Sequence, residues 1–389
     1  MAIFIFGMKL MSDGLHNVAG DKMRTVLRLF SANRFVGILS GATVTAVIQS
    51  SSASTVMVIG FVNAGLLTLV QVIAIIFGAN IGTTVTAQIV AFDIEWIIMP
   101  SIIIGLLLSF VPVRSIRNWS ETVIGLGFIF FGMTLMSGQL KSLASDPAFM
   151  QLFQIFNCAP VDGVIPPLAL LGAIGVGVAA TFVVQSSSAV SGIVIALGIS
   201  GLVDLYTAVA LILGSNIGTT VTAQLASLTA NRIAKQTALA HTLFNVIGVI
   251  IVAGTFWFTI DGEPIFFKAV KSFSDSENDL ARQIANAHTL FNVTATIILV
   301  GFIPLLAKIC EKVIPVEKER TKFQRLEPHL LYTPSIALAQ TAGALRKMLK
   351  KSWKIVDCTL CLYNKNDEKN QNVLKQLEKR EADVDERQK

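Results

Sequence analysis

The chain has few charged residues, because Asp, Glu, Lys and Arg make up only 14% of its 389 positions. An average soluble domain carries roughly 25%. The charges are also unevenly distributed: positions 1–310 hold 14 Lys/Arg and 13 Asp/Glu, and the last 79 positions hold the other 17 and 12. This distribution excludes an ordinary soluble fold. It predicts a membrane-embedded part, residues 1–310, followed by a polar tail, residues 311–389.

Cysteine is also scarce, with four residues in the whole chain. Cys158 and Cys310 stand alone, and Cys358 and Cys361 form a single C-x-x-C in the tail, so neither a disulfide framework nor a zinc site is predicted. The sequence has no G-x-S-x-G elbow and no G-x-x-x-x-G-K-[ST] loop, which argues against a hydrolase and against a nucleotide-driven pump. We therefore expect no enzyme activity and no cofactor.

Long apolar runs recur along residues 1–310, and several approach the ~20 residues that a membrane-spanning helix needs. They are Val70–Ala91, Trp96–Pro112, Thr122–Met136, Leu205–Leu228, Thr237–Thr259 and Ala285–Leu306. The first run, Ala2–Met11, is too short to span, so we expect further residues upstream. The net charge of +6 fits the Lys/Arg excess beside membrane spans and does not indicate a nucleic-acid partner. The runs predict an all-α polytopic membrane protein.

Two motifs occur twice at a constant spacing of 136 residues. Gln-Ser-Ser-Ser lies at Gln49–Ser52 and again at Gln185–Ser188. Gly-x-Asn-Ile-Gly-Thr-Thr-Val-Thr-Ala-Gln lies at Gly78–Gln88 and again at Gly214–Gln224, with ten of eleven positions identical. Because both motifs repeat in one register, the sequence predicts an internal duplication.

The charge of the loops predicts that the two copies are inverted across the membrane. Residues 13–35 are basic, whereas the equivalent loop, 138–166, carries one Lys and no Arg. Short cytoplasmic loops are enriched in Lys and Arg, so residues 13–35 are expected inside and residues 138–166 outside. The second copy then has the opposite orientation to the first, provided that residues 36–66 and 168–202 are re-entrant hairpins. The expected domains are a first repeat, residues 1–118, a second repeat with two further helices, residues 119–310, and a cytoplasmic helical tail, residues 311–389.

Each Gln-Ser-Ser-Ser motif places hydroxyl and amide groups in the middle of an apolar hairpin. Burying such groups without partners costs roughly 1–3 kcal/mol each, so they are expected to bind a ligand. Ser is a common N-cap, and a helix that restarts at each motif would turn its positive dipole end toward an anion.

Neutral oxygens around the same motifs suit a hard cation such as sodium, and unwound backbone carbonyls near Gly82 and Gly218 would add ligands. Asp204 is the only acidic or basic residue within 36–91 and 168–228. A bound oxyanion and its cations would therefore neutralise one another, which couples their binding. The competing interpretation is close helix packing, for which Ser, Thr and Gly are common in membranes; the duplicated spacing favours a binding site.

A further duplication, Ala-His-Thr-Leu-Phe-Asn, begins at Ala240 and at Ala287. His and Asn four residues apart share one helix face. Interhelical hydrogen bonding is the favoured role, with a proton relay or a substrate contact as the alternative. We place these residues in a possible second shell around the substrate: His241, Asn245, His288 and Asn292.

The duplicated motifs resemble those of bacterial sodium/phosphate cotransporters, which are related to the animal type II sodium-dependent phosphate cotransporters. The resemblance covers residues 1–310, and the segment Leu331–Gln340 resembles the start of a PhoU-like cytoplasmic domain, which we expect to be incomplete here. The implied phosphate ligands are Gln49, Ser50, Ser51, Ser52, Gln185, Ser186, Ser187 and Ser188. The implied sodium ligands are Gln49, Ser52, Asn80, Thr83, Thr84, Gln185, Ser188, Asn216, Thr219 and Thr220, and sodium is the only metal expected.

This resemblance implies sodium-driven import of inorganic phosphate by alternating access. It also implies a bacterial cytoplasmic (inner) membrane location, a cytoplasmic tail and, as an expected assembly, a homodimer. The residues alone leave two alternatives open: a carrier of the same architecture for another oxyanion such as sulfate, and a membrane sensor that reports phosphate through the tail.

Overall fold

The computed structural model describes residues 1–29, 33–63, 66–92, 94–161, 163–274, 279–315, 334–363 and 381. It divides into two units, Met1–Pro315 and Val316–Lys389. Over the described part of the chain almost all regular structure is helical, as predicted, and a single two-stranded antiparallel sheet pairs β1 (Thr259–Ile260) with β2 (Glu263–Pro264).

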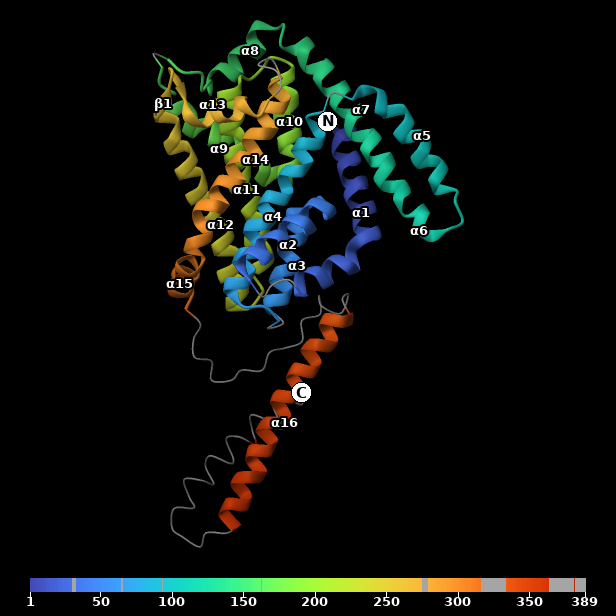
Figure 1. Ribbon diagram of the computed structural model, residues 1–389, viewed down its shortest axis with the longest axis vertical. Helices are drawn as coiled ribbons and strands as arrows, with labels where there is room; N and C mark the ends of the chain where they lie inside the picture. Colours follow the sequence, from blue (N-terminus) through green and yellow to red (C-terminus); the bar gives the residue numbers. More distant parts are fainter. Residues whose placement is uncertain are drawn as a thin grey trace. The chain divides into compact units, whose positions relative to one another are not determined.

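The helices of the first unit follow one another with short connections (Figure 1). They are α1 (Ala2–Leu29), α2 (Arg34–Ile48), α3 (Ser51–Asn63), α4 (Leu69–Val90), η1 (Glu95–Ile97), α5 (Ile98–Ser109), α6 (Arg114–Arg117), α7 (Trp119–Leu143), α8 (Pro147–Gln154), α9 (Pro167–Val184), α10 (Ser187–Ile199), α11 (Leu205–Ser227), α12 (Arg232–Gly254), η2 (Thr255–Trp257), α13 (Ile265–Ser272), α14 (Leu280–Leu299), η3 (Val300–Phe302) and α15 (Ile303–Val313).

Among the described residues, six helical segments are long and apolar enough to cross a membrane, which confirms a multi-pass membrane protein. They are Leu69–Val90, Trp119–Leu143, Pro167–Val184, Leu205–Ser227, Arg232–Trp257 and Leu280–Val313. Four shorter apolar helical segments accompany them: Arg34–Ile48, Ser51–Asn63, Glu95–Ser109 and Ser187–Ile199. Two short pairs, α2 with α3 and α9 with α10, are the segments predicted to form hairpins.

Helix α1 is longer than the sequence suggested. We expected an apolar run ending at Met11 and then a loop, but the helix continues without interruption to Leu29. No proline or paired glycine stops it, since the first proline of the chain is Pro100, and polar residues are compatible with a helix at any position that does not require burial.

Glycine pairs bring α2 against α4 and α9 against α11. A Cβ on Gly78 would lie 1.8 Å from the carbonyl oxygen of Ile38, and a Cβ on Gly214 would lie 2.0 Å from that of Ile174. On the facing helices, a Cβ on Gly41 or on Gly177 would come similarly close to the backbone of α4 or of α11. Small residues permit this close approach of helix backbones in membranes, so each short helix before a Gln-Ser-Ser-Ser motif lies directly against an Asn-Ile-Gly-Thr-Thr helix.

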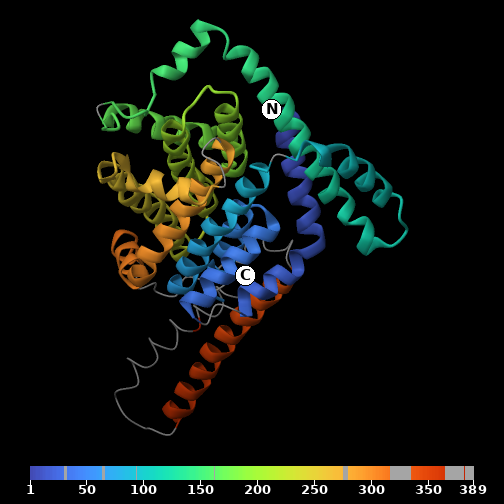
Figure 2. The same ribbon diagram turned by 45° about the horizontal axis from the view of Figure 1, so that its top comes forward.

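Helices α1, α5 and α7 pack together beside the remaining helices of the first unit (Figure 2). Large apolar side chains on α5 and next to its two ends are exposed: Trp96, Met99, Ile103, Ile104, Leu106, Leu107 and Phe110. A continuous apolar outer surface of this kind suits lipid rather than water.

In the second unit, the structure describes α16 (Pro334–Tyr363). The sequence predicts two amphipathic helices in the tail, Ile336–Cys361 and Asn370–Arg387, and α16 confirms the first. The second predicted tail helix, Asn370–Arg387, lies outside the described residues apart from Glu381. The PhoU-like character of this tail stays a prediction.

Candidate functional site

Both Gln-Ser-Ser-Ser motifs break a helix at the glutamine. Gln49 ends α2 with a φ of 58° and Gln185 ends α9 with a φ of 56°, both in the left-handed region. A side chain other than glycine in this region costs roughly 1–2 kcal/mol. In each case the backbone N–H still bonds the carbonyl four residues earlier, of Thr45 or of Thr181. The same strained turn thus occurs at the two positions that are 136 residues apart.

A new helix starts immediately after each break, as predicted from the serines. The backbone N–H of Ala53 donates to Ser50 Oγ at 3.2 Å, and that of Ala189 donates to Ser186 Oγ at 3.2 Å. Each serine therefore caps the next helix. The remaining N–H groups of the first turn stay outside the helical bonding pattern and point toward the break, which favours an anion there.

The two glutamine side chains have different surroundings. Gln49 is buried, accepts a hydrogen bond from Thr86 Oγ1 at 2.6 Å and donates to the carbonyl of Ala46. Gln185 is exposed. The two halves of the candidate site are therefore similar in backbone and different in side-chain packing.

One hydrogen bond joins the first break to the second half of the chain. Ser52 Oγ lies 3.2 Å from the hydroxyl of Thr222 on α11, 170 residues away. Thr222 also donates to the carbonyl of Thr219. The first Gln-Ser-Ser-Ser motif and the second Asn-Ile-Gly-Thr-Thr motif are thus neighbours, as expected for motifs that share one site.

The predicted sodium ligands on α4 and α11 are buried, and their donor groups are occupied by helix carbonyls. Thr83 donates to Ala79 O and Thr219 donates to Ser215 O, each at 2.9 Å. Asn80, Thr84, Asn216 and Thr220 bond carbonyls three or four residues earlier in the same way. Because the hydroxyl hydrogens of the four threonines point backwards along the helix, the lone pairs of their oxygens can face a cation; the side-chain oxygens of Asn80 and Asn216 already have partners on α12 and α14.

The expected unwinding near Gly82 and Gly218 is wrong. Helices α4 and α11 run continuously through these glycines, so the backbone carbonyls there are part of the helical bonding pattern. A Cβ on Gly82 would lie 2.4 Å from the carbonyl oxygen of Ala42. The glycine is there because a neighbouring helix touches it, and not because the chain unwinds.

Three pairs of hydroxyl side chains near the breaks were not among the predicted ligands; all are buried except Thr222, which is half-buried. The partners of the first break, Thr86 and its counterpart Thr222, belong to the repeated motif but were not selected. Thr55 on α3 and Ser191 on α10, also 136 residues apart, are fully buried, and their hydroxyl oxygens have no hydrogen-bond partner. Each lies one helical turn after a motif serine, so the recurrence of a hydroxyl at this spacing was the available signal.

The third pair differs between the copies because of one substitution. Thr181 Oγ1 donates to Ser215 Oγ at 2.8 Å, but its counterpart Thr45 has no partner for its hydroxyl. The residue equivalent to Ser215 is Ala79, the single mismatch in the eleven-residue motif. A sequence difference of one oxygen atom thus accounts for the missing bond.

The duplicated His and Asn residues lie inside the helix bundle and connect to both Asn-Ile-Gly-Thr-Thr helices. His241 Nε2 of α12 is 3.4 Å from Asn80 Oδ1, and Asn292 Nδ2 of α14 donates to Asn216 Oδ1 at 3.3 Å. This confirms the predicted interhelical hydrogen bonding for His241 and Asn292, but not for His288 and Asn245: the ring of His288 has no hydrogen-bond partner, and the amide of Asn245 bonds its own helix.

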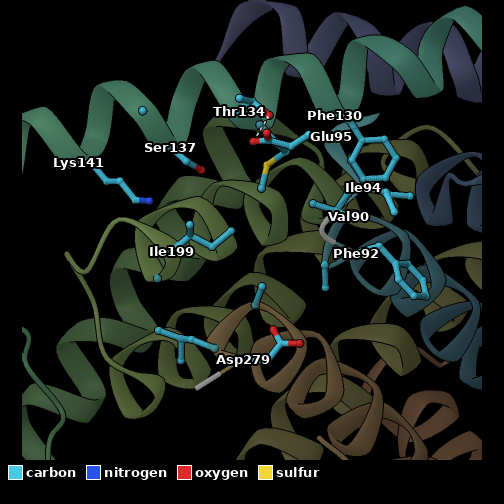
Figure 3. Close-up of a pocket in the computed structure, with 16 residues that line it drawn as sticks. Val90, Phe92, Ile94, Glu95, Phe130, Thr134, Ser137, Lys141, Ile199 and Asp279 are labelled. Carbon is cyan, nitrogen blue, oxygen red and sulfur yellow. Dashed lines mark hydrogen bonds between the residues drawn. The ribbon is translucent and has the colours of Figure 1, made fainter. Parts of the chain in front are cut away.

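A pocket of about 820 Å³ lies away from the two Gln-Ser-Ser-Ser breaks (Figure 3). It lies between α7 and the ends of α4, α10 and α14, and its polar lining includes Glu95, Thr134, Lys141 and Asp279. Thr134 Oγ1 donates to Glu95 at 3.3 Å. None of the predicted phosphate or sodium ligands lines this pocket, so we do not assign it to the ligand site.

The described residues contain no group of three His, Cys, Asp or Glu side chains that would hold a metal ion. A transition-metal site therefore has no support in this part of the chain. Neutral amide and hydroxyl oxygens are the available ligands.

Comparison with known proteins gives one family and several relatives. The model of the Na+/Pi-cotransporter family matches residues 3–138 and 169–265, which include both breaks and both Asn-Ile-Gly-Thr-Thr helices. No solved structure matches the chain.

Among curated proteins, "Uncharacterized protein YqeW" of Bacillus subtilis is 34% identical over 252 residues, covering 64% of this chain and 78% of the relative. "Putative inorganic phosphate export protein YjbB" of Salmonella typhimurium is 27% identical over 348 residues, which is 88% of this chain but only 60% of that protein's length. "Sodium-dependent phosphate transport protein 2C" of Mus musculus is 45% identical over 83 residues, 20% of this chain and 14% of the relative. The family model spans more than half of the sequence, and the chain therefore belongs to the Na+/Pi-cotransporter family, a family of transporters and not of enzymes.

Proposed function

We propose that this protein is a sodium-coupled transporter of inorganic phosphate whose ligand site is formed by the two Gln-Ser-Ser-Ser breaks. The observation that carries the proposal is the pair of left-handed glutamines, each followed by a serine-capped helix, in segments without basic residues. Phosphate would bind the helix starts and serine hydroxyls, and sodium the neutral oxygens beside them. Membership of the Na+/Pi-cotransporter family supports both ligands.

The absence of fixed charge in these segments explains coupling. A doubly charged anion in a low-dielectric site is unfavourable without a counter-charge. Since the chain supplies none there, bound sodium ions would supply it. Each ion would then raise the affinity for phosphate, and phosphate would raise the affinity for sodium by the same factor.

We further propose that the two motif-bearing segments are inverted repeats with re-entrant hairpins. Contacts at one end of the first unit involve two basic segments, residues 13–35 and the region of Arg232 and Lys235, which their Lys/Arg content assigns to the cytoplasm. Arg34 bonds Val300 O at 3.3 Å, Asn231 bonds Asn63, and Arg232 bonds Pro315 O. Such repeats place binding sites near the bilayer midplane in many secondary transporters.

Contacts at the other end involve segments that are poor in Lys and Arg, residues 138–166 and the loop after α4, and are therefore expected on the outer side. Cys158 N donates to Thr207 Oγ1 at 2.9 Å, and Gln88 Nε2 donates to Asn286 Oδ1 at 3.2 Å. Figure 1 places α8 and α13 at this end and α15 at the opposite end. This separation supports the inverted arrangement and a cytoplasmic tail.

The test is uptake of radiolabelled phosphate into proteoliposomes with and without a sodium gradient. We expect sodium-dependent uptake that Gln49→Ala and Gln185→Ala abolish. Gln154→Ala, which changes an exposed glutamine of α8, serves as the matched control and retains uptake. Uptake that ignores sodium would refute the coupling, and normal uptake by both site variants would refute the site.

The direction of transport has two candidates. A symporter driven by the inward sodium gradient imports phosphate. The name of the Salmonella relative favours export. Cells that express the chain decide between them: import raises and export lowers cellular phosphate. Competition by sulfate in the same liposomes tests another oxyanion as substrate, and absence of any flux would favour a sensor.

A further inference from the structure

Each Asn-Ile-Gly-Thr-Thr helix is bonded, near its C-terminal end, to a helix that carries Ala-His-Thr-Leu-Phe-Asn. Gln88 Nε2 of α4 donates to Thr289 Oγ1 of α14 at 2.9 Å, and Gln224 Nε2 of α11 donates to Thr242 Oγ1 of α12 at 2.8 Å. The contact of α4 with α14 lies at the end assigned above to the outside, and we call it the outer seam. The contact of α11 with α12 lies toward the cytoplasmic end, and we call it the inner seam. The glutamine bond is common to both seams.

The outer seam is reinforced by a positively charged side chain. Arg282 Nη1 of α14 donates to Gln88 Oε1 at 3.0 Å and lies 3.5 Å from the backbone carbonyl oxygen of Gln88, in the last turn of α4. Its guanidinium also lies over the ring of Phe92, 4.1 Å from the ring centre, and Gln88 Nε2 donates to Asn286 Oδ1 at 3.2 Å. A hydrogen bond from a guanidinium is roughly twice as strong as a neutral one, and the stacked ring adds a cation–π attraction. Arg282 thus clamps α14 to α4.

The inner seam has no such clamp. Three residues of the outer seam have counterparts of different chemistry there: Lys235 for the arginine, Leu239 for the asparagine and Leu228 for the phenylalanine. Lys235 forms no side-chain hydrogen bond or ion pair with the residues that the structure describes, and Gln224 Oε1 accepts none from them. Of the polar side-chain bonds between described residues of α11 and α12, the neutral one from Gln224 to Thr242 therefore stands without a charged partner.

Other polar contacts of α12 at the cytoplasmic end do not strengthen the inner seam. Asn231 bonds Asn63 of α3, and Arg232 and Gln236 bond the carbonyls that follow α15. These contacts hold α12 to α3 and to the end of α15, and not to α11. Helix α12 can therefore part from α11 without breaking a charged bond, whereas α14 cannot part from α4 in that way.

The outer seam closes over one of the predicted sodium ligands. Gln88 lies one helical turn beyond buried Thr84, so the two share a face of α4. Phe92 and residues 279–281, which directly precede Arg282, line the pocket of about 820 Å³ (Figure 3). The arginine therefore stands at the edge of open space into which its side chain can move. Parting of α14 from α4 would uncover the face of α4 that leads to Thr84.

We propose that Arg282 is a positioning residue for transport: it keeps the outer seam closed, and its release from Gln88 opens the outer approach to the ligand site. The inner seam, held by a neutral glutamine bond, parts more easily. Arg282 is not itself a ligand of phosphate or sodium. The inference rests on the proposed transport, because a transporter must open the two approaches to its site in turn.

The experiment is hydrogen–deuterium exchange of the full chain in lipid nanodiscs, without sodium or phosphate. We expect Arg282→Gln to raise amide exchange at residues 84–92 and 280–289 about tenfold, the scale of one lost charge-assisted hydrogen bond. Exchange at the inner seam, residues 220–228 and 232–242, should stay unchanged. Lys268→Gln is the matched control, because it removes a basic residue whose partner is exposed Asp261 and should leave both seams unchanged.

Two milder variants guard against misfolding of Arg282→Gln. Arg282→Lys keeps the charge but loses the planar fork, so its exchange at the outer seam should fall between those of wild type and Arg282→Gln. Phe92→Leu removes only the stacked, exposed ring and should raise the same exchange by a smaller factor. Unchanged exchange at the outer seam in all three variants would overturn the inference. An equal rise in every helix would also overturn it, because Arg282 would then stabilise the fold in general.

Phosphate uptake into proteoliposomes supplies a second readout. Arg282→Gln should lower the KM for phosphate, because a larger fraction of the molecules is then open to the outer side. A reduced kcat with an unchanged KM would contradict the positioning role. The exchange measurement contains no ligand, so it reports on the seams whether or not the chain transports phosphate. Wild-type uptake that ignores sodium would remove the coupling proposal and leave the result on the outer seam standing.

Discussion

Replacing Ala79 by serine should restore to the first motif the hydrogen bond that the second motif already has. In the second motif Thr181 donates to Ser215 at 2.8 Å, and in the first motif Thr45 is buried without a partner. The backbones are equally spaced, because a Cβ on Gly41 would lie 3.1 Å from the Ala79 nitrogen and one on Gly177 would lie 3.0 Å from the Ser215 nitrogen. The added oxygen therefore has room in the first motif.

The expected gain in the free energy of unfolding comes from one new hydrogen bond between buried groups. An intramolecular hydrogen bond contributes about 0.5–1.5 kcal/mol net, and interhelical bonds in membranes average roughly 0.6 kcal/mol. We expect Ala79→Ser to raise the free energy of unfolding by about 1 kcal/mol. Ser215→Ala should lower it by about 1–3 kcal/mol, because it leaves Thr181 unpaired.

Unfolding by detergent titration, followed by circular dichroism, measures both changes. The matched control is Ala79→Ser in a Thr45→Val background, where the new serine has no threonine hydroxyl to bond and the gain should vanish. A gain of equal size in that background, or a loss of stability in the single variant, would refute the assignment of the bond.

Three further outcomes follow from the packing. Gln49→Ala should destabilise the fold by about 1–3 kcal/mol because it leaves buried Thr86 unpaired, while Gln185→Ala at an exposed position should be near neutral in the same unfolding assay. Gly78→Ala should lower stability by about 1–3 kcal/mol through overpacking; Gly138→Ala, where a Cβ meets nothing within 4 Å, should not. Burial raises the pKa of Cys158 to about 12, with the Asp204 charge adding to it. Its thiol should therefore resist maleimide at pH 8 until the protein unfolds, and fast labelling of Cys158 itself in the folded chain, located by peptide mass mapping, would contradict this.

The serine caps were predictable from sequence because capping is a local interaction. Ser50 and Ser186 each bond a backbone N–H three residues ahead, and the residue type alone favours that geometry. The membrane spans were predictable for a similar reason, since length and apolarity identify them.

The different surroundings of the two glutamines were not predictable. Both belong to identical Gln-Ser-Ser-Ser motifs, so the difference between buried Gln49 and exposed Gln185 depends on the packing of distant helices. The prediction that the helix unwinds near Gly82 was wrong for the same reason, because it too depends on how distant helices pack. A glycine in an apolar run fits both a broken helix and a close crossing, and only the position of Ala42 O decides between them.

The glycine contacts between α2 and α4, and between α9 and α11, also limit how the protein can move. Backbones that touch at Gly78 and Gly214 leave no side-chain layer that could rearrange and let one helix slide along the other. Each glutamine break must therefore travel together with its Asn-Ile-Gly-Thr-Thr helix as one rigid body, and any step that carries ions across the membrane must take place at the borders of these pairs.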